Sequence, residues 1–209
     1  MTHTFLCTAS ALVLMSAGAV AAPADQPGHQ SPKPGTSNET MSAIKDSTAS
    51  VVGKISAKFT STTEGFVTAA AVSDLYEVTA GEIAQQRAQS PAVKDFARQM
   101  VEAHKGTTSQ LKSLIASHDI RVTPPAHVDN RRQGLLDDLR GAKAEDFDHR
   151  YISQQIAAHK EADILMRGYA KDGDNAAIKE FAATTGRAVK MHLSMAEKLD
   201  KSQKTASNN

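Results

Sequence analysis

Residues 90–118 read SPAVKDFARQMVEAHKGTTSQLKSLIASH, and this stretch decides the fold. Ser90-Pro91 is a helix-start signal, because serine caps helices and proline fits the first helical position. After it, apolar residues recur at steps of three and four, which predicts one long helix to about His118. One position on this apolar face is occupied by a titratable side chain, His104.

The same periodicity predicts three further long helices, over residues 61–88, 145–171 and 175–199. Ser61 and Glu64 form a capping-box pattern at the first of them. Pro124-Pro125 interrupts the connection that follows residue 118, and we expect one short helix there, over 129–140. Short links join the first and second and the third and fourth long helices. We therefore predict an all-α fold, an antiparallel four-helix bundle over residues 61–200 with a short extra helix in its long connection.

Composition and charge agree with close-packed helices and exclude a strongly basic protein. The chain is 40% hydrophobic but only 4% aromatic, and 24 Lys and Arg balance 23 Asp and Glu. A β-sandwich would carry more β-branched and aromatic residues. The charge balance does not predict a basic surface for binding nucleic acid. The basic doublet Arg131-Arg132 is interpreted as solvated surface.

The amino-terminal region predicts export. Residues 1–22 contain no Lys, Arg, Asp or Glu, and an apolar run ends in Ala19-Val20-Ala21. We interpret residues 1–21 as a signal peptide, with an uncleaved anchor as the alternative, and expect a periplasmic or secreted protein. Cys7 is the only cysteine, so the mature chain would have no thiol and no disulfide.

Residues 22–60 are expected to form a flexible leader, and residues 201–209 a polar tail. Within the leader, Met41–Phe59 repeats apolar residues near helical spacing. This segment is either an amphipathic helix that contacts a protein or the cell envelope, or a partly ordered linker.

Four titratable residues fall on the apolar faces of the four long helices: Glu77, His104, His159 and His192. A buried polar side chain is unfavourable unless it has a partner, so four of them predict a common site in the core. Counting residues from the turns places the first three about 18, 21 and 19 Å deep, and His192 about 27 Å deep. Tyr151 is expected to donate a hydrogen bond to a buried acceptor, His192 among the candidates.

Imidazole and carboxylate ligands suit a transition metal, so these four residues predict one metal ion, with zinc or copper favoured. Met100, Met191 and Met195 lie near the histidines in sequence and would favour copper, unless they only pack the core. The alternative is a metal-free hydrogen-bond network in which Glu77 accepts protons from the histidines. The other histidines of the body, His118, His127 and His149, are expected on the surface or in loops.

Several stretches in this order resemble a known family: residues 66–84, VKDFARQMVEAH ending at His104, FDHRYISQQIAAHKEA around His159, and MHLSMAEKL around His192. They resemble the exported, ferritin-like family labelled domain of unknown function 4142 (DUF4142). The resemblance implies export and a ferritin-like four-helix bundle, and it supplies no activity. A di-iron centre is not expected, because that site needs Glu-x-x-His pairs and Glu102 lies only two residues before His104.

The leading hypothesis from the sequence is an exported metal-binding or stress-related accessory protein that uses Glu77, His104, His159 and His192. The alternative is a structural or interaction module, with homo-oligomerisation among its expected modes, whose polar core only specifies the fold. An enzyme lacks support, because the chain has no phosphate-binding loop and no nucleophile elbow.

Overall fold

The structure is a computed structural model that describes residues 61–207. The chain divides into two units, Met1–Thr40 and Met41–Asn209, and every described residue belongs to the second. All regular elements in this part of the chain are helices, which confirms the all-α class. They are α3 (Thr63–Arg87), α4 (Pro91–Ser117), α5 (Asn130–Gly141), α6 (Ala144–Asp172) and α7 (Ala176–Ser207). The expected signal peptide (1–21), leader (22–60) and amphipathic segment (41–59) lie outside the described residues.

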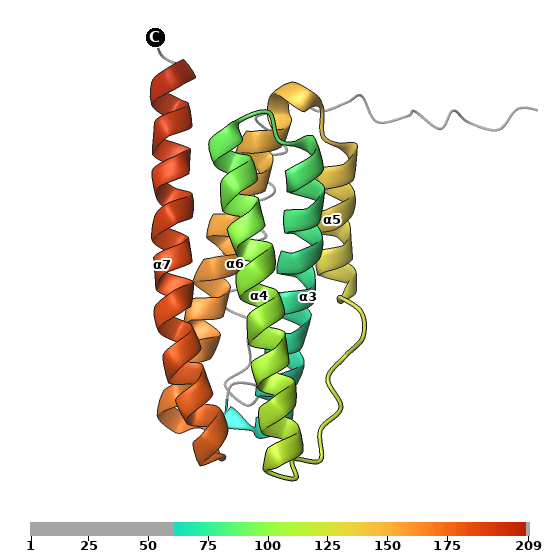
Figure 1. The fold of residues 1–209 in the computed structure, drawn as a ribbon, viewed down its shortest axis with the longest axis vertical. Coiled ribbons are helices and arrows are strands. Elements are labelled where there is room, and N and C mark those ends of the chain that lie inside the picture. The colour runs from blue at the N-terminus through green and yellow to red at the C-terminus, as the bar shows by residue number, and fades with distance from the viewer. Residues whose placement is uncertain (1–60, 208–209) are drawn as a thin grey trace, which may run out of the picture. The chain divides into compact units, whose positions relative to one another are not determined.

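Four long helices lie side by side, and the short helix α5 lies alongside them (Figure 1). α3 packs along α4, and α6 packs along α7. These two pairs meet through contacts between α3 and α6 and between α4 and α7, while α5 packs on α3 and α6. No helix within residues 61–207 combines the length and the apolar composition that crossing a membrane would need.

The helix ends differ from the sequence expectation in three places. Thr62, not Ser61, caps α3, and its hydroxyl accepts a hydrogen bond from the Gly65 amide at 3.2 Å. Ser90 precedes α4 without a side-chain cap; the amides of Gln89 and Ser90 donate to the Asp148 carboxylate of α6 at 2.9 and 2.7 Å. α7 continues to Ser207 instead of ending near Leu199, so the polar tail expected over 201–209 is helical as far as it is described.

Arg87 fastens the end of α5 to the α3–α4 hairpin. Its guanidinium donates to the carbonyls of Leu139 at 2.6 Å and Ala142 at 2.5 Å, and also to that of Arg140. The same group lies over the Phe147 ring, 5.1 Å from its centroid. The last carbonyls of a helix have no amide partner within the helix. Here the Arg87 guanidinium of α3 provides the hydrogen-bond donors for the carbonyls at the end of α5.

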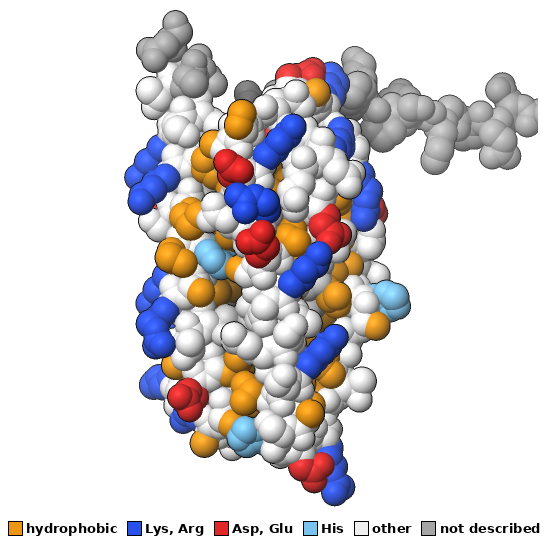
Figure 2. Space-filling model, viewed as in Figure 1, with side chains coloured by type: hydrophobic (Ala, Val, Ile, Leu, Met, Phe, Trp, Pro, Cys, Tyr) orange, Lys and Arg blue, Asp and Glu red, His pale blue; other side chains and the backbone are white. Residues whose placement is uncertain are grey.

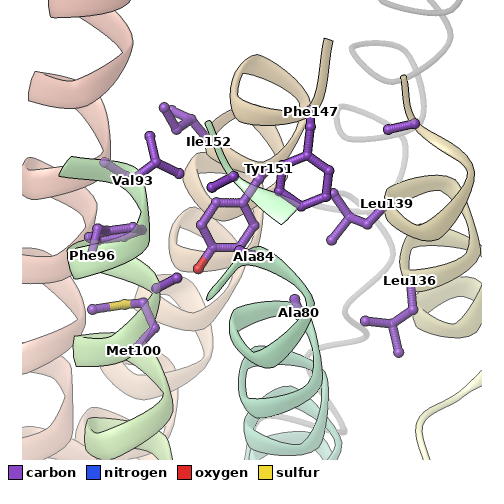
Figure 3. Packing of buried hydrophobic residues seen from close by; sticks show 14 of the residues in the cluster. Ala80, Ala84, Val93, Phe96, Met100, Leu136, Leu139, Phe147, Tyr151 and Ile152 are labelled. Carbon is purple, nitrogen blue, oxygen red and sulfur yellow. The ribbon is translucent and has the colours of Figure 1, made fainter. Parts of the chain in front are cut away.

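The apolar core forms two clusters. The first contains Tyr76, Ala80, Met100, Tyr151 and Ile152 and is closed on one side by Leu136 and Leu139 of α5. Figure 3 shows the Tyr151 ring next to Phe147, with its hydroxyl pointing away from Phe147 and toward the level of Met100. The second cluster lies nearer the other end of the long helices and includes Phe66, Leu111, Tyr169, Phe181 and Val189.

Charged side chains are confined mostly to the outside. On the face shown in Figure 2, basic and acidic side chains are interspersed over α3 and α4, and Lys and Arg follow the outer edge of α7. Met191 is the exception among the large apolar side chains of the described residues, being 58% exposed. Because most charged side chains lie on the surface, the titratable side chains that are buried in the core are unusual.

Gly81 sets the distance between α3 and α4. A Cβ atom there would lie 2.7 Å from Cγ2 of Val101 and 3.0 Å from the Ala97 carbonyl oxygen. We expect Gly81→Ala to lower the free energy of unfolding by about 1–3 kcal/mol, because overpacking outweighs the better helix propensity of alanine. Denaturant unfolding measures this change.

Gly106 provides the matched control, because it lies in α4, is exposed, and has no atom within 4 Å of an added Cβ. Gly106→Ala should raise the free energy of unfolding by up to about 1 kcal/mol. Equal stability of the two variants would contradict a tight approach of α3 to α4 at Gly81.

Candidate metal centre

The four titratable residues singled out by the sequence are all buried. The exposed fractions are 1% for Glu77, 6% for His104, 1% for His159 and 8% for His192. They come from α3, α4, α6 and α7 respectively. Together with two further buried residues they form a polar layer between the two apolar clusters, composed of Asp74, Glu77, His104, Gln155, His159 and His192.

His104, His159 and His192 converge on one another and form a histidine group. Ring centroids lie 5.7 Å apart for His104 and His159, 5.9 Å for His104 and His192, and 5.5 Å for His159 and His192. One ring nitrogen from each histidine lies within 4.8 Å of the other two. Bonds of about 2.0–2.1 Å from zinc to nitrogen would require only a small inward adjustment of these side chains.

His192 lies level with its partners, so the expectation that it sits one to two turns deeper was wrong. Counting residues measures the position of Cα along the helix axis but ignores the direction of the side chain. Side chains lean toward the N-terminus of their helix, and α6 and α7 run in opposite directions. The His159 ring therefore leans away from the α6–α7 turn while the His192 ring leans toward it, which reduces the difference in depth.

Partners on the outer side of two histidine rings fix their orientation. Nδ1 of His104 lies 2.7 Å from Oδ1 of Asp74, and Thr108 donates to the other Asp74 oxygen at 3.0 Å. Nδ1 of His159 lies 2.9 Å from the Gln155 carbonyl oxygen one turn earlier in α6. Histidines that bind metal commonly donate their second ring N–H to a carboxylate or a backbone carbonyl.

Asp74 was missed by the sequence analysis, although it is only 4% exposed. A signal was present: Asp74 follows Ala70 by four residues and precedes Glu77 by three, so all three share one helix face. Ser73 lies next to it on the expected buried face and is also buried, at 9%. The buried polar residues of α3 therefore cover more of the helix surface than the single row of positions that the sequence spacing indicated.

The opposite ring nitrogens have no hydrogen-bond partner among the described residues. They are Nε2 of His104, Nε2 of His159 and Nδ1 of His192. Most buried polar atoms in proteins are paired, and an unpaired one costs about 1–3 kcal/mol. Three unpaired nitrogens from three converging rings form a set of donors suited to a transition-metal ion.

Glu77 lies beside the histidine group but is not a member of it. Its Oε1 lies 3.7 Å from Nδ1 of His159, the nitrogen that already meets the Gln155 carbonyl. Its Oε2 has no hydrogen-bond partner in the described range 61–207. Burial raises the pKa of the Glu77 carboxyl, while His104 and the neighbouring Gln155 act in the opposite direction. The structure thus brings together three of the four expected ligands.

Tyr151 does not donate to His192, contrary to expectation. Its hydroxyl has no hydrogen-bond partner in the described structure. Burial raises the pKa of Tyr151 well above its ordinary value, and the negative charge of Glu77 raises it further. The hydroxyl therefore remains neutral beside Glu77.

The two histidines that lack a hydrogen bond to a carboxylate are held neutral by burial. Burial lowers the pKa of His159 to about 4, with a contribution from the charge of His104. Burial likewise lowers the pKa of His192 to about 4, and His159 and His104 contribute. For His104, burial acts to lower the pKa, but the hydrogen bond to Asp74 and the charge of Glu77 raise it overall.

These pKa values predict that the metal-free protein loses stability in mild acid. The pKa of His159 is about 4 when folded against an ordinary 6.5, so the unfolded chain binds the proton first. The free energy of unfolding should fall as pH drops from 6.5 toward 4, by about 3 kcal/mol from His159 alone. His104 contributes in the opposite sense, because its raised pKa favours the folded state below 6.5.

Denaturant unfolding of the chelator-treated protein at a series of pH values measures this loss. His159→Leu should make the profile less steep between pH 4 and 6.5, with the remaining slope due to His192. His127→Asn, at an exposed position, should leave the profile as in the wild type. A His159→Leu profile that matches the wild type would show that His159 is not held neutral by burial.

The remaining polar residues are accounted for by the fold. His118 and His127 are exposed, which agrees with their expected surface positions, and His149 is half-buried. Arg131 and Arg132 are not simply solvated: both pair with Glu161 of α6, at 2.8 and 3.1 Å. They join α5 to α6.

Comparisons with known proteins give one match. A family model described as "Domain of unknown function (DUF4142)" matches residues 50–199. The matched range includes every residue of the polar layer. No curated protein and no solved structure matches the chain.

Proposed function

The chain belongs to the DUF4142 family, a domain of unknown function, and from that premise we propose that it is an exported metal-binding accessory protein. The histidine group holds one transition-metal ion. The observation that carries the proposal is the convergence of three buried ring nitrogens within 4.8 Å, with the outer nitrogens of two rings held by Asp74 and the Gln155 carbonyl. A polar core that served folding alone would not need three converging rings that each keep a nitrogen without a hydrogen-bond partner among residues 61–207.

Zinc or copper is the proposed metal. Imidazole suits both, and no thioether is needed in the ligand set. A di-iron centre is disfavoured, because its Glu-x-x-His pairs are missing before His104, His159 and His192. We also propose that α3, α4, α6 and α7 form a ferritin-like four-helix bundle, supported by their lateral contacts and by ligands that project from facing helices.

Metal analysis after purification without an affinity tag tests the proposal. We expect one zinc or copper ion per chain, and stoichiometric rebinding of either ion after chelation. A chain that retains no metal and binds both ions only weakly and non-stoichiometrically would contradict it.

Asp74 should increase the affinity of the histidine group for zinc, because it holds the His104 ring. Asp74→Asn keeps the shape of the side chain but removes the charge that orients the ring and increases its basicity. We expect zinc affinity to fall about 10–100-fold, as measured by competition with a chromophoric chelator. Asp95→Asn, an exposed aspartate in α4, is the control and should leave affinity unchanged. Equal affinities of the two variants would argue against orientation of His104 by Asp74.

A structural or interaction module is the second candidate. It is favoured by the hydrogen bonds that His104 and His159 already make in the absence of a ligand. In that case the segment Met41–Phe59 is the proposed contact with a protein or envelope partner, or with a second copy of the chain. Deletion of residues 41–59 should then abolish association and leave the helical body folded.

Export is proposed from residues 1–21. Amino-terminal sequencing of the protein recovered from the native host tests it, and a mature chain that begins near residue 22 is expected. A chain that begins at Met1 and is released with the cytoplasm would contradict export.

A further inference from the structure

The histidine group supplies three protein ligands, and the nearby carboxylates face away from the point where its inner nitrogens meet. Asp74 contacts Nδ1 of His104, whereas the unpaired nitrogen of that ring is Nε2. Glu77 lies near Nδ1 of His159, whereas the unpaired nitrogen there is also Nε2. Neither carboxylate belongs to the set of mutually close ligand atoms. Zinc sites with three protein ligands keep the fourth position for water or substrate, unlike closed structural sites.

Unpaired polar atoms accumulate beside the histidine group, toward the first apolar cluster. Within the part of the chain that the structure describes, Oε2 of Glu77 and the hydroxyl of Tyr151 have no hydrogen-bond partner, and both residues are at least 99% buried. Gln155 is fully buried and lies one turn before His159; its amide atoms make no hydrogen bond of normal geometry within the described residues, but the side chain lies close enough to Glu77 to lower the pKa of that carboxyl. The core on this side of the histidine group is therefore polar, and none of these side chains belongs to the set of mutually close ligand atoms.

His192 is the member of the histidine group nearest to solvent. It is the most exposed member of the histidine group, at 8%, and it lies on α7 next to the exposed Met191. The histidine group is thus buried on all sides, with His192 its least deeply buried member.

We propose that the metal centre is coordinatively open: water completes the coordination of the ion held by the histidine group, and small anions replace that water. Glu77 is not itself a metal ligand, because it lies against Nδ1 of His159 and not against the unpaired Nε2 of that ring. This inference rests on the proposed metal binding. It extends that function from holding an ion to presenting the ion to a small oxygen or nitrogen ligand.

Cobalt(II) substitution tests the inference in the full chain, with sodium azide as the probe. Cobalt reports its own coordination through its visible absorption. We expect one cobalt per chain and a saturable spectral change with azide. A cobalt spectrum that azide does not alter would overturn the open site while leaving the proposed metal binding intact. A chain that binds no cobalt, zinc or copper would overturn both.

Glu77 variants separate the two ways in which the fourth position could be filled. If water fills it, Glu77→Gln should bind cobalt within about threefold of the wild type and still respond to azide. If Glu77 fills it, the wild type should not respond and Glu77→Gln should become responsive, which would overturn the inference. Glu82→Gln is the matched control in α3, where the exposed carboxylate pairs with Lys105 at 2.9 Å. It should behave as the wild type in both measurements.

Discussion

Replacing His159 by leucine should remove tight metal binding and leave a folded protein. The variant loses one of three converging nitrogens, and the remaining two cannot enclose an ion. We expect zinc affinity to fall by more than about 100-fold, beyond the 10–100-fold range known for residues that act through a ligand. Competition titration with a chromophoric chelator measures this loss.

The metal-free form of the same variant should be as stable as the wild type. Among the described residues, the hydrogen-bond acceptor that His159 leaves behind is the Gln155 carbonyl, which lies inside α6 and keeps its helical partner. Leucine fits an apolar environment and removes the unpaired Nε2 from the core. We expect a free energy of unfolding within about 1 kcal/mol of the wild type, or higher.

His127→Leu is the matched control, since it removes an exposed histidine outside the polar layer. It should retain wild-type zinc affinity. Loss of affinity in both variants, or in neither, would contradict a centre built on the histidine group. Unfolding of the His159→Leu chain would instead show that the polar layer is needed for the fold itself.

Phe66→Ala should lower the stability of the folded chain more than Gly81→Ala or His159→Leu. Phe66 is fully buried, its ring centroid lies 4.3 Å from that of Tyr169, and the Phe181 ring meets it edge-on at 6.3 Å. Removing a buried phenyl ring costs about 3–5 kcal/mol, through lost transfer energy and the cavity left behind. Chemical denaturation measures the difference.

The cost should be near the upper end of that range, because Phe66 supports a polar network at the same end of the body. The Tyr169 hydroxyl lies 2.8 Å from the Thr63 hydroxyl and donates to Asp174 at 2.9 Å. This network joins the start of α3 to the turn between α6 and α7. Loss of the ring beside Tyr169 loosens both connections.

Met191→Ala is the control for Phe66→Ala. It also truncates a large apolar side chain, but one that is 58% exposed. We expect a change within about 0.5 kcal/mol. A comparable loss in both variants would mean that the outer face of α7 is covered by another part of the chain or by a partner.

Saturating zinc should partly compensate for Phe66→Ala. A ligand that binds only the folded state adds about 2.7 kcal/mol of stability at 100 times its dissociation constant. The polar layer crosses all four long helices, so metal binding links both hairpins at the level between the two apolar clusters. Metal content and thermal stability of the protein should therefore rise together.

The sequence determined the helical class, the approximate helix bounds and the burial of the four titratable residues. Apolar residues at steps of three and four define one face of a helix, so Glu77, His104, His159 and His192 could be placed on buried faces from spacing alone. The family could also be identified, since its motifs occur in order along the chain. Periodicity fails at the ends of helices, where a cap such as Thr62 or a continued turn depends on single local contacts.

Only the tertiary structure decided how these residues meet. The period of a helix gives the direction of a side chain around its own axis, but not the relative shift and tilt of two packed helices. For that reason the level of His192, the pairing of His104 with Asp74 and the position of Glu77 outside the histidine group could not be read from spacing. The same holds for Arg87 and Asp148, whose partners lie more than 50 residues away in the chain. Contacts between distant segments depend on where helices dock, and that is determined by the packing of the whole core.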